Sequence, residues 1–135
     1  MDPVLKNAIE QLHDLASWVN LATIGHDGGP HVTPMMMGIH EQGLLFSLTG
    51  KQKQRNMERD PRVCVSISKP RSMAHVIVWG NMVIRRDDAA QEIWEKMITD
   101  AFGSSGLDQR SRELSEEGTS LGVLTPTHHR IYGLD

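Results

Sequence analysis

The sequence predicts a small, mainly β domain, in which antiparallel strands form a barrel with helices at its ends. Short apolar segments alternate with Gly-, Pro- and Asp-containing turns through most of the chain. Two amphipathic helical patterns flank these segments. The chain has 135 residues, which is the length of one domain with a real core. We therefore expect a single domain over residues 1–135.

Helical patterns occur at the start, in the middle and in the second half of the chain. Asp2 and Pro3 suit the N-cap and the first helical position. Asp60 and Pro61 end a run of helix-forming residues. The predicted helices cover residues 3–16, 51–59, 88–101 and 107–117, with a flexible loop at 102–106.

Strand patterns fill the remainder of the chain. They cover residues 18–25, 30–40, 44–48, 62–68 and 73–85, and a last strand over 120–133 that Thr125 and Pro126 interrupt. Pro34 removes a donor from the strand ladder and indicates an edge, a bulge or a bend. Gly80, inside the fifth strand, indicates a bulge or bend where a barrel curves.

Composition excludes several classes of function. The net charge is −3 and 23% of residues are charged, which argues against a nucleic-acid-binding protein with a basic face. Cys64 is the single cysteine, so no intramolecular disulfide forms. The N-terminal residues do not resemble a signal peptide, and no segment has the length of a membrane helix. These features predict a cytoplasmic protein without a membrane partner.

The strongest chemical signal lies where a strand meets the helix at 51–59. Thr49 and Gly50 are followed by Lys51 and Lys53 in the first helical turn. Cations at a helix N-terminus are disfavoured by about 0.3–1 kcal/mol each. An anion such as a phosphate would reverse this cost by pairing with the lysines and the free backbone N–H groups. The alternative is a solvated basic turn; neither GxxxxGK[ST] nor GxGxxG occurs.

Residues 22–68 and the fifth strand resemble the pyridoxamine 5′-phosphate oxidase-like split-barrel superfamily. The resemblance rests on GPHVTPMMM, GLLFSLTGKQKQRNMERDPRVCVSI and VIVWGNMVI, and is greatest to the short members that use the deazaflavin coenzyme F-420. It implies a six- or seven-stranded antiparallel split β-barrel of the FMN-binding type. It also implies a homodimer with cofactor sites at the subunit interface.

The resemblance assigns roles to individual residues. Lys53 is expected to contact the cofactor phosphate, with support from Lys51 and Asn56. The second strand is expected to run its backbone along the ring system, and His75 to reach the partner's cofactor. The full set of expected cofactor-binding residues is Lys51, Gln52, Lys53, Asn56, His31, Val32, Thr33, Pro34, Met35, Met36, Phe46, Ser47 and His75.

Departures from the superfamily's oxidases favour deazaflavin. Gln52 stands where those relatives often carry Arg, and His31 stands where they place a basic residue. The chain ends in HHRIYGLD in place of a longer Arg-rich segment. We expect an oxidoreductase that transfers a hydride between deazaflavin and a small unsaturated or quinone-like substrate. An FMN-dependent oxidase or reductase, and a non-catalytic flavin- or haem-binding protein, remain alternatives; no acid or base is assigned.

Other residues are given structural roles. His128 and His129 are neighbours on a strand and point to opposite faces, and no zinc motif occurs, so no protein-bound metal is expected. Trp79 is the tryptophan expected to lie nearest a ligand. By alternation, Met35 faces one side of its strand and Met36 the other, so only part of the methionine triplet lines a site.

Overall fold

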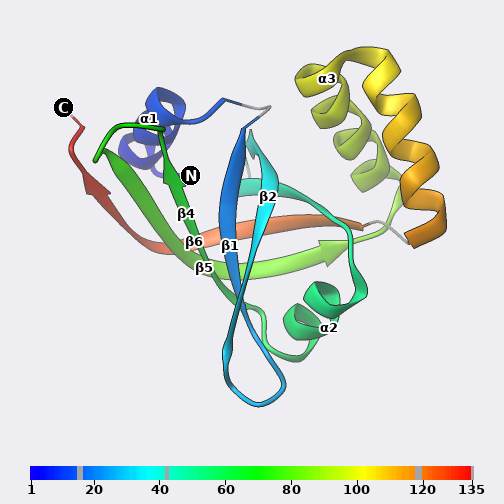
Figure 1. Ribbon diagram of the computed structural model, residues 1–135, viewed down its shortest axis with the longest axis horizontal. Coiled ribbons are helices and arrows are strands. Elements are labelled where there is room, and N and C mark those ends of the chain that lie inside the picture. The colour runs from blue at the N-terminus through cyan, green and yellow to red at the C-terminus, as the bar shows by residue number, and fades with distance from the viewer. Residues whose placement is uncertain (15–16, 42, 118–119, 135) are drawn as a thin grey trace.

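The computed structural model describes residues 1–14, 17–41, 43–117 and 120–134, with 106–117 described by their backbone alone. Within these ranges six antiparallel strands form a closed barrel in the order β1-β2-β3-β6-β5-β4, which confirms the predicted fold class (Figure 1). The strands are β1 (Trp18–Ile24), β2 (Pro30–His40), β3 (Gly43–Leu48), β4 (Arg62–Ser68), β5 (His75–Arg85) and β6 (Ser120–Tyr132). The helices are α1 (Pro3–Leu12), α2 (Lys51–Arg59) and α3 (Asp88–Glu117).

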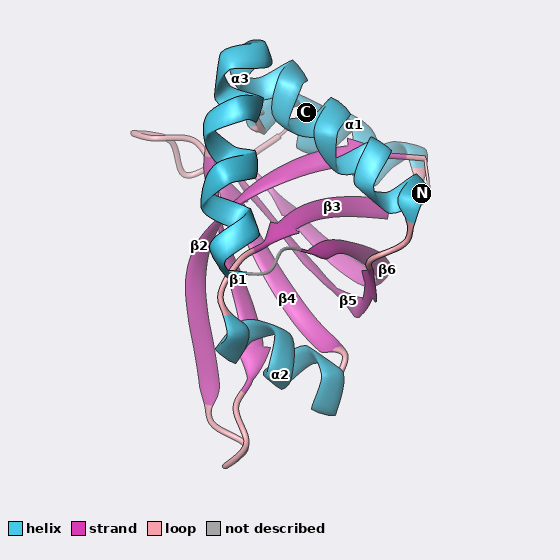
Figure 2. Cartoon of the chain, turned by 90° about the vertical axis from the view of Figure 1, so that its right-hand side faces the viewer, coloured by secondary structure: helices cyan, strands magenta, loops and turns pink. Residues whose placement is uncertain are grey.

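The barrel interior is filled by alternate residues of each strand, as the period of a strand requires. Leu21, Phe46, Val65, Val78 and Leu124 are fully buried there, and burial of each such side chain stabilises the fold by about 1.5–3 kcal/mol. α1 adds its apolar stripe of Leu5, Ala8, Ile9 and Leu12 to the same core. The helices α1 and α3 lie toward one end of the barrel and α2 toward the other (Figure 2).

The first helix is shorter than predicted. α1 ends at Leu12, and residues 15–16 lie outside the described residues. His13 is extended, with φ −97° and ψ 127°. Its Nε2 donates to the carbonyl of Met37 on β2 across 2.6 Å. This tertiary bond ends the helix where the local periodicity alone would continue it.

A second apolar cluster lies between α3 and the outer side of the barrel. Trp94 and Ile98 of α3 pack there with Leu45, Leu121 and Val123. The predicted break at 102–106 is shorter than expected: two helical segments meet at a kink, where Gly103 has the non-helical angles φ 77° and ψ 178°. Glycine reaches this conformation without a steric penalty, so the helix kinks at one residue and the expected helix over 107–117 follows directly.

β6 is continuous, contrary to the predicted interruption at Thr125 and Pro126. The irregularity lies in the pairing with β5, whose register shifts between Trp79 and Gly80, and Pro126 pairs with Gly80. A Cβ atom on Gly80 would lie 2.2 Å from the carbonyl oxygen of Thr125. The predicted bulge at Gly80 is therefore confirmed, and it allows this close approach of the two backbones.

β2 is paired unequally along its two edges. It pairs with β1 over residues 30–36, but with β3 only over 37–40. One edge of the segment 30–36 thus lacks a strand partner among the described strands, which is where Pro34 is tolerated. This half of the β1–β2 hairpin extends beside α2 (Figure 1). It is the framework of the site described below.

Among the described residues, none of the helices is both long and apolar enough for a membrane crossing.

Candidate anion-binding site

The N-terminus of α2 lacks the features that usually neutralise a helix end. Its N-cap is Gly50, at φ 90°, with no side-chain cap bond and no acidic residue in the first turn. By contrast, the Asp2 carboxylate caps α1 by accepting from the N–H groups of Val4 and Leu5. The first turn of α2 instead carries Lys51 and Lys53. A helix end with free N–H groups and cationic side chains is suited to an anion.

Lys53 reaches from α2 to β2. Its Nζ donates to the sulfur of Met35 across 3.2 Å, and a thioether is a weak acceptor for an ammonium group. Met35 is buried and Lys53 half-buried, whereas Lys51 is exposed. The structure thus brings Lys53, to which the resemblance assigns the phosphate contact, against the strand that the resemblance places along the ring.

Two polar atoms on β2 complete this side of the site. His31, Thr33, Met35 and Met37 share one face of the strand, because side chains alternate. Within the part of the chain that the structure describes, His31 Nδ1 and Thr33 Oγ1 are buried without a hydrogen-bond partner. A buried, unsatisfied polar group costs about 1–3 kcal/mol. These atoms lie on the same strand face as the Lys53–Met35 contact, and a polar ligand bound there would supply their missing hydrogen bonds.

Asn56 lies beside this cluster, and both ends of its amide are engaged within the protein. Its Nδ2 donates to Thr23 Oγ1 across 3.2 Å, and its Oδ1 accepts from Gln52 Nε2 and Arg59 Nη2, each at 2.9 Å. The bond to Thr23 joins α2 to β1, and the other two lie within α2. Sequence reasoning missed Thr23 and Arg59. Strand alternation could have identified Thr23, because it follows Val19 and Leu21 on the inward face of β1 and is a polar residue there.

A second network, buried at Gln54 and Ser120, lies on the other flank of α2. The side-chain oxygen of Gln54 accepts from Arg86 Nη2 at 2.9 Å and from Ser120 Oγ at 2.6 Å. Arg86 also forms a salt bridge with Glu58 at 3.0 Å. These residues come from α2, β6 and the β5–α3 junction, so sequence patterns gave no indication of them. A pocket of about 30 Å³, lined partly by Arg86, Trp94 and Ser120, adjoins this network and has room for about one water molecule.

The remaining predicted residues of β2 and β3 lie elsewhere. Val32 and Pro34 are exposed on the opposite face of β2, and Met36 packs against the cluster under α3. On β3, Phe46 is in the barrel core, and Ser47 Oγ accepts from Trp94 Nε1 at 2.8 Å. The side chains of these five residues are not brought to the Lys53 cluster, so any contact with a ring there would be made by backbone.

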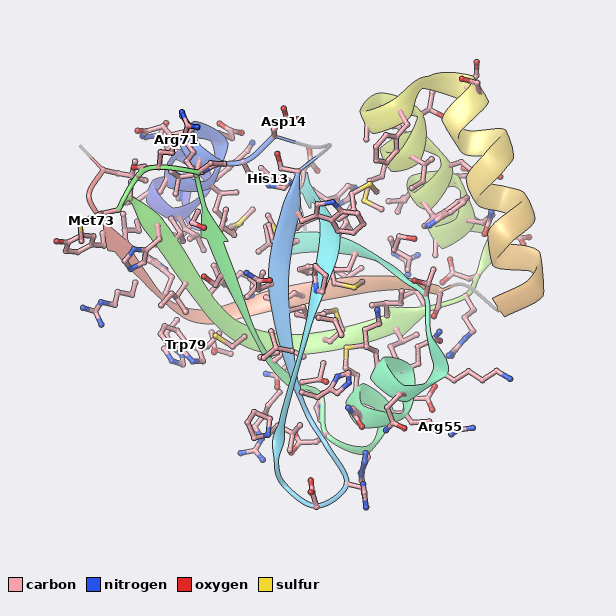
Figure 3. All side chains as sticks on the ribbon, viewed as in Figure 1. His13, Asp14, Arg55, Arg71, Met73 and Trp79 are labelled. Atoms are coloured by element: carbon pink, nitrogen blue, oxygen red, sulfur yellow. The ribbon has the colours of Figure 1, made fainter. Side chains whose placement is uncertain are left out.

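His75 is the first residue of β5, and this strand begins near α1, whereas α2 is at the other end of the barrel (Figure 1). Its ring stacks on Tyr132, with centroids 5.2 Å apart. Farther along β5, Trp79 stacks on His128 at 4.6 Å. Trp79 and Arg55 of α2 project on different sides of the β1–β2 hairpin (Figure 3). Trp79 therefore belongs to the outer surface of the barrel and not to the anion site of its own chain.

On the outer face of β2, α3 covers Met36, whereas no described helix lies in front of the part of the β1–β2 hairpin that carries Val32 and Pro34 (Figure 1). Trp18 is 70% exposed and Val32 is 61% exposed on this face. Cys64 lies on the neighbouring strand opposite Ala22 and Trp79. Burial raises the pKa of the Cys64 thiol, which disfavours the reactive thiolate. Within the described residues, no three His, Cys, Asp or Glu side chains gather closely enough to hold a metal ion.

The closed six-stranded barrel among the described residues, with an uncapped, lysine-bearing helix end beside a half-paired strand, defines a split-barrel protein. The model of the pyridoxamine 5′-phosphate oxidase family matches residues 5–128, and the chain belongs to this family.

Solved structures with the same fold include proteins with different roles. An F-420 reductase has a TM-score of 0.66 at 24% identity, covering 90% of this chain and 94% of the other. A Listeria innocua protein provisionally described as a pyridoxamine 5′-phosphate oxidase has a TM-score of 0.69 at 22% identity, covering 96% and 95%. The haem-storage protein HutZ from Vibrio cholerae has a TM-score of 0.69 at 17% identity, covering 96% and 93%. At these identities the likeness shows the fold alone. A comparison with curated proteins gives no match.

Proposed function

We propose that this protein is an oxidoreductase that binds the deazaflavin coenzyme F-420 and transfers a hydride between it and a small unsaturated or quinone-like substrate. The observation that carries the proposal is the cluster at the N-terminus of α2. There Lys53 contacts β2 beside two buried polar atoms without a partner among the described residues. The coenzyme would supply the hydride chemistry, and the protein would supply position and electrostatics.

The residues present fit a phosphorylated coenzyme. The backbone N–H groups of the first turn of α2, with Lys51 and Lys53, would hold the phosphate. Gly50 has no side chain, so an anion can approach the backbone closely there. Its φ of 90° is also one that favours glycine. The half-paired edge of residues 30–36 offers backbone groups to the ring, although Pro34 has only its carbonyl to contribute. The flexible thioether side chain of Met35 would form part of an apolar wall beside the bound coenzyme.

FMN is the second candidate, because the family is that of an FMN-type oxidase and FMN offers a phosphate to the same helix end. Gln52 favours deazaflavin over FMN. Its amide donates to Asn56 and supplies no charge where the FMN oxidases that the chain resembles often carry Arg. A haem-binding role is the third candidate. It is supported by the fold shared with HutZ and by His75 and His128 on the outer face of the barrel.

We further propose that the protein is a homodimer with its cofactor sites at the interface. The open outer face of β1 and β2, which carries Trp18 and Val32, would be covered by a second copy. Aromatic side chains are typical anchors of such interfaces. In the dimer, His75 would approach the partner's coenzyme. Light scattering should give twice the monomer mass, and Trp18→Glu should yield the monomer; a monomeric wild type would contradict the proposal.

Direct titration of the purified protein tests the proposed function. Coenzyme F-420, FMN and haemin are added separately, and binding is followed by anisotropy or by the haem absorbance. Micromolar or tighter binding of F-420 supports the proposal, and hydride transfer to quinone-like acceptors is then assayed. Tighter binding of FMN would move the oxidase alternative to first place. Binding of haemin alone, or of none of the three, would contradict a flavin-type redox enzyme.

A further inference from the structure

The helix α2 is docked on the barrel mainly by polar side chains. Its buried residues are Gln54, Asn56 and Met57, so a single apolar side chain accompanies two amides. Apolar burial has no preferred direction, whereas a hydrogen bond weakens steeply when its angle departs from linearity. The two amides therefore set the orientation of α2 on the barrel, and with it the direction in which its N-terminal N–H groups point.

The amide of Gln54 is held in one orientation. Its Oε1 accepts from Ser120 Oγ at 2.6 Å and from Arg86 Nη2 at 2.9 Å. Because a guanidinium group only donates, the oxygen must be the end of the amide that faces Arg86. Nε2 then points to the carbonyl oxygen of Leu48, 3.4 Å away. The charge of Arg86 is balanced by Glu58 at 3.0 Å, so the network adds no net charge beside α2.

The contacts of Gln54 converge on the connection between β3 and α2. Leu48 ends β3, and Lys51 begins α2 shortly after it. Ser120 begins β6 and pairs with Leu48 in the sheet, while Arg86 lies between β5 and α3. The end of β5 and the beginning of β6 both lie next to α2 (Figure 1). Gln54 thus ties the first turns of α2 to three other segments of the barrel.

We propose that Gln54 is a positioning residue of the anion site. Its amide, held by Arg86 and Ser120, fixes the direction in which the first turn of α2 faces the phosphate. This inference rests on the proposed function, in which the coenzyme phosphate is the anion. Gln54 acts through the helix, because its amide is bonded within the protein. Asn56 holds the opposite flank through its bond to Thr23, so the two amides clamp α2 from both sides.

Two uncharged substitutions test this role. Gln54→Met keeps the length of the side chain and removes its hydrogen bonds, whereas Ser120→Ala removes one donor and is the milder change. Each variant is titrated with coenzyme F-420 and with its riboside, which has the same ring and no phosphate. The ratio of the two dissociation constants reports the preference for the phosphate. We expect this preference to fall about five- to tenfold in Gln54→Met and about two- to threefold in Ser120→Ala.

A second readout separates positioning from a loss of stability. Residual dipolar couplings of the backbone N–H groups, measured without a ligand, report the orientation of α2 relative to the barrel. The orientation should differ from that of the wild type in Gln54→Met. Ile9→Val is the matched control, because Ile9 is buried in α1 at the opposite end of the barrel (Figure 2). It should destabilise the fold and leave both the orientation of α2 and the phosphate preference unchanged.

The outcomes distinguish this inference from the function on which it rests. If the wild type binds neither compound, the proposed function fails, and the role of Gln54 fails with it. If the wild type prefers the coenzyme and folded Gln54→Met keeps the same preference, the function stands and the inference about Gln54 is overturned. Should Gln54→Met not fold, the same comparison is made on Ser120→Ala, and an unchanged preference there overturns the inference.

Discussion

The buried amide of Asn56 donates to the hydroxyl of Thr23 across 3.2 Å, and this bond fastens the candidate phosphate-binding helix α2 to β1. The same amide accepts from Gln52 and Arg59. The role of Asn56 in this arrangement is to position α2, since its polar atoms are already engaged. Any effect of Asn56 on ligand binding would therefore pass through the placement of the helix.

Asn56→Ala should destabilise the fold by about 1–3 kcal/mol, because the Thr23 hydroxyl and the two donors lose a buried partner. Thr23→Val, which keeps the shape of the side chain, should cost a similar amount. Urea unfolding of the two single variants and the double variant gives their coupling energy. We expect the double variant to lose less than the sum of the single losses; strict additivity would show that the bond contributes nothing.

Gly80→Ala should be among the most damaging small substitutions in the barrel. The added methyl group would lie 2.2 Å from the carbonyl oxygen of Thr125, and overpacking of this kind typically costs about 1–3 kcal/mol. Asn81→Ala, at the adjacent exposed position, is the control and should unfold near the wild-type urea concentration. Equal midpoints for Gly80→Ala and the wild type would refute the close approach at the bulge.

Asp60, which ends α2, provides a test at acid pH. Hydrogen bonds from the side chain and then the backbone N–H of Arg62 lower the pKa of Asp60 from 3.8 to about 2. Because the folded-state pKa is below the unfolded value, the pair stabilises the fold fully above that unfolded value, and the contribution is lost as pH falls through about 2. Carboxyl NMR should show a midpoint near 2 that returns toward 3.8 in Arg62→Gln. A wild-type midpoint at 3.8 would contradict the pair.

Local signals predicted the elements that hold the site. β2 and α2 have the expected bounds, because turn residues and a helix-ending Asp–Pro pair delimit them within a few positions. The break between the two helical segments of α3 was expected as a loop of five residues, whereas one glycine in a positive-φ conformation is enough to make it. The shorter α1 depends on a bond from His13 to Met37, which is distant in sequence.

Part of the arrangement around the N-terminus of α2 could be predicted from the sequence. Lys53 was assigned to the cofactor phosphate through the resemblance, and the structure places its ammonium group against Met35 of β2. The inward direction of His31 and Thr33 follows from the alternation that also buries Met35 and Met37, so sequence alone could have separated their side chains from those of Val32 and Pro34. The Asn56–Thr23 and Gln54–Ser120 contacts join segments 33 and 66 residues apart, and no single-sequence pattern encodes such pairs.

Binding of coenzyme F-420 and its phosphate-free riboside to Lys53→Ala is the most direct test of the central claim, that the N-terminus of α2 is a phosphate site. Lys53→Ala should weaken the coenzyme about tenfold or more, about 1.4 kcal/mol, and leave the riboside unchanged. Lys96→Ala is the matched control, because Lys96 is exposed on α3 and paired with Asp100, and it should match the wild type. Equal affinity of the wild type and Lys53→Ala for the coenzyme would contradict the claim.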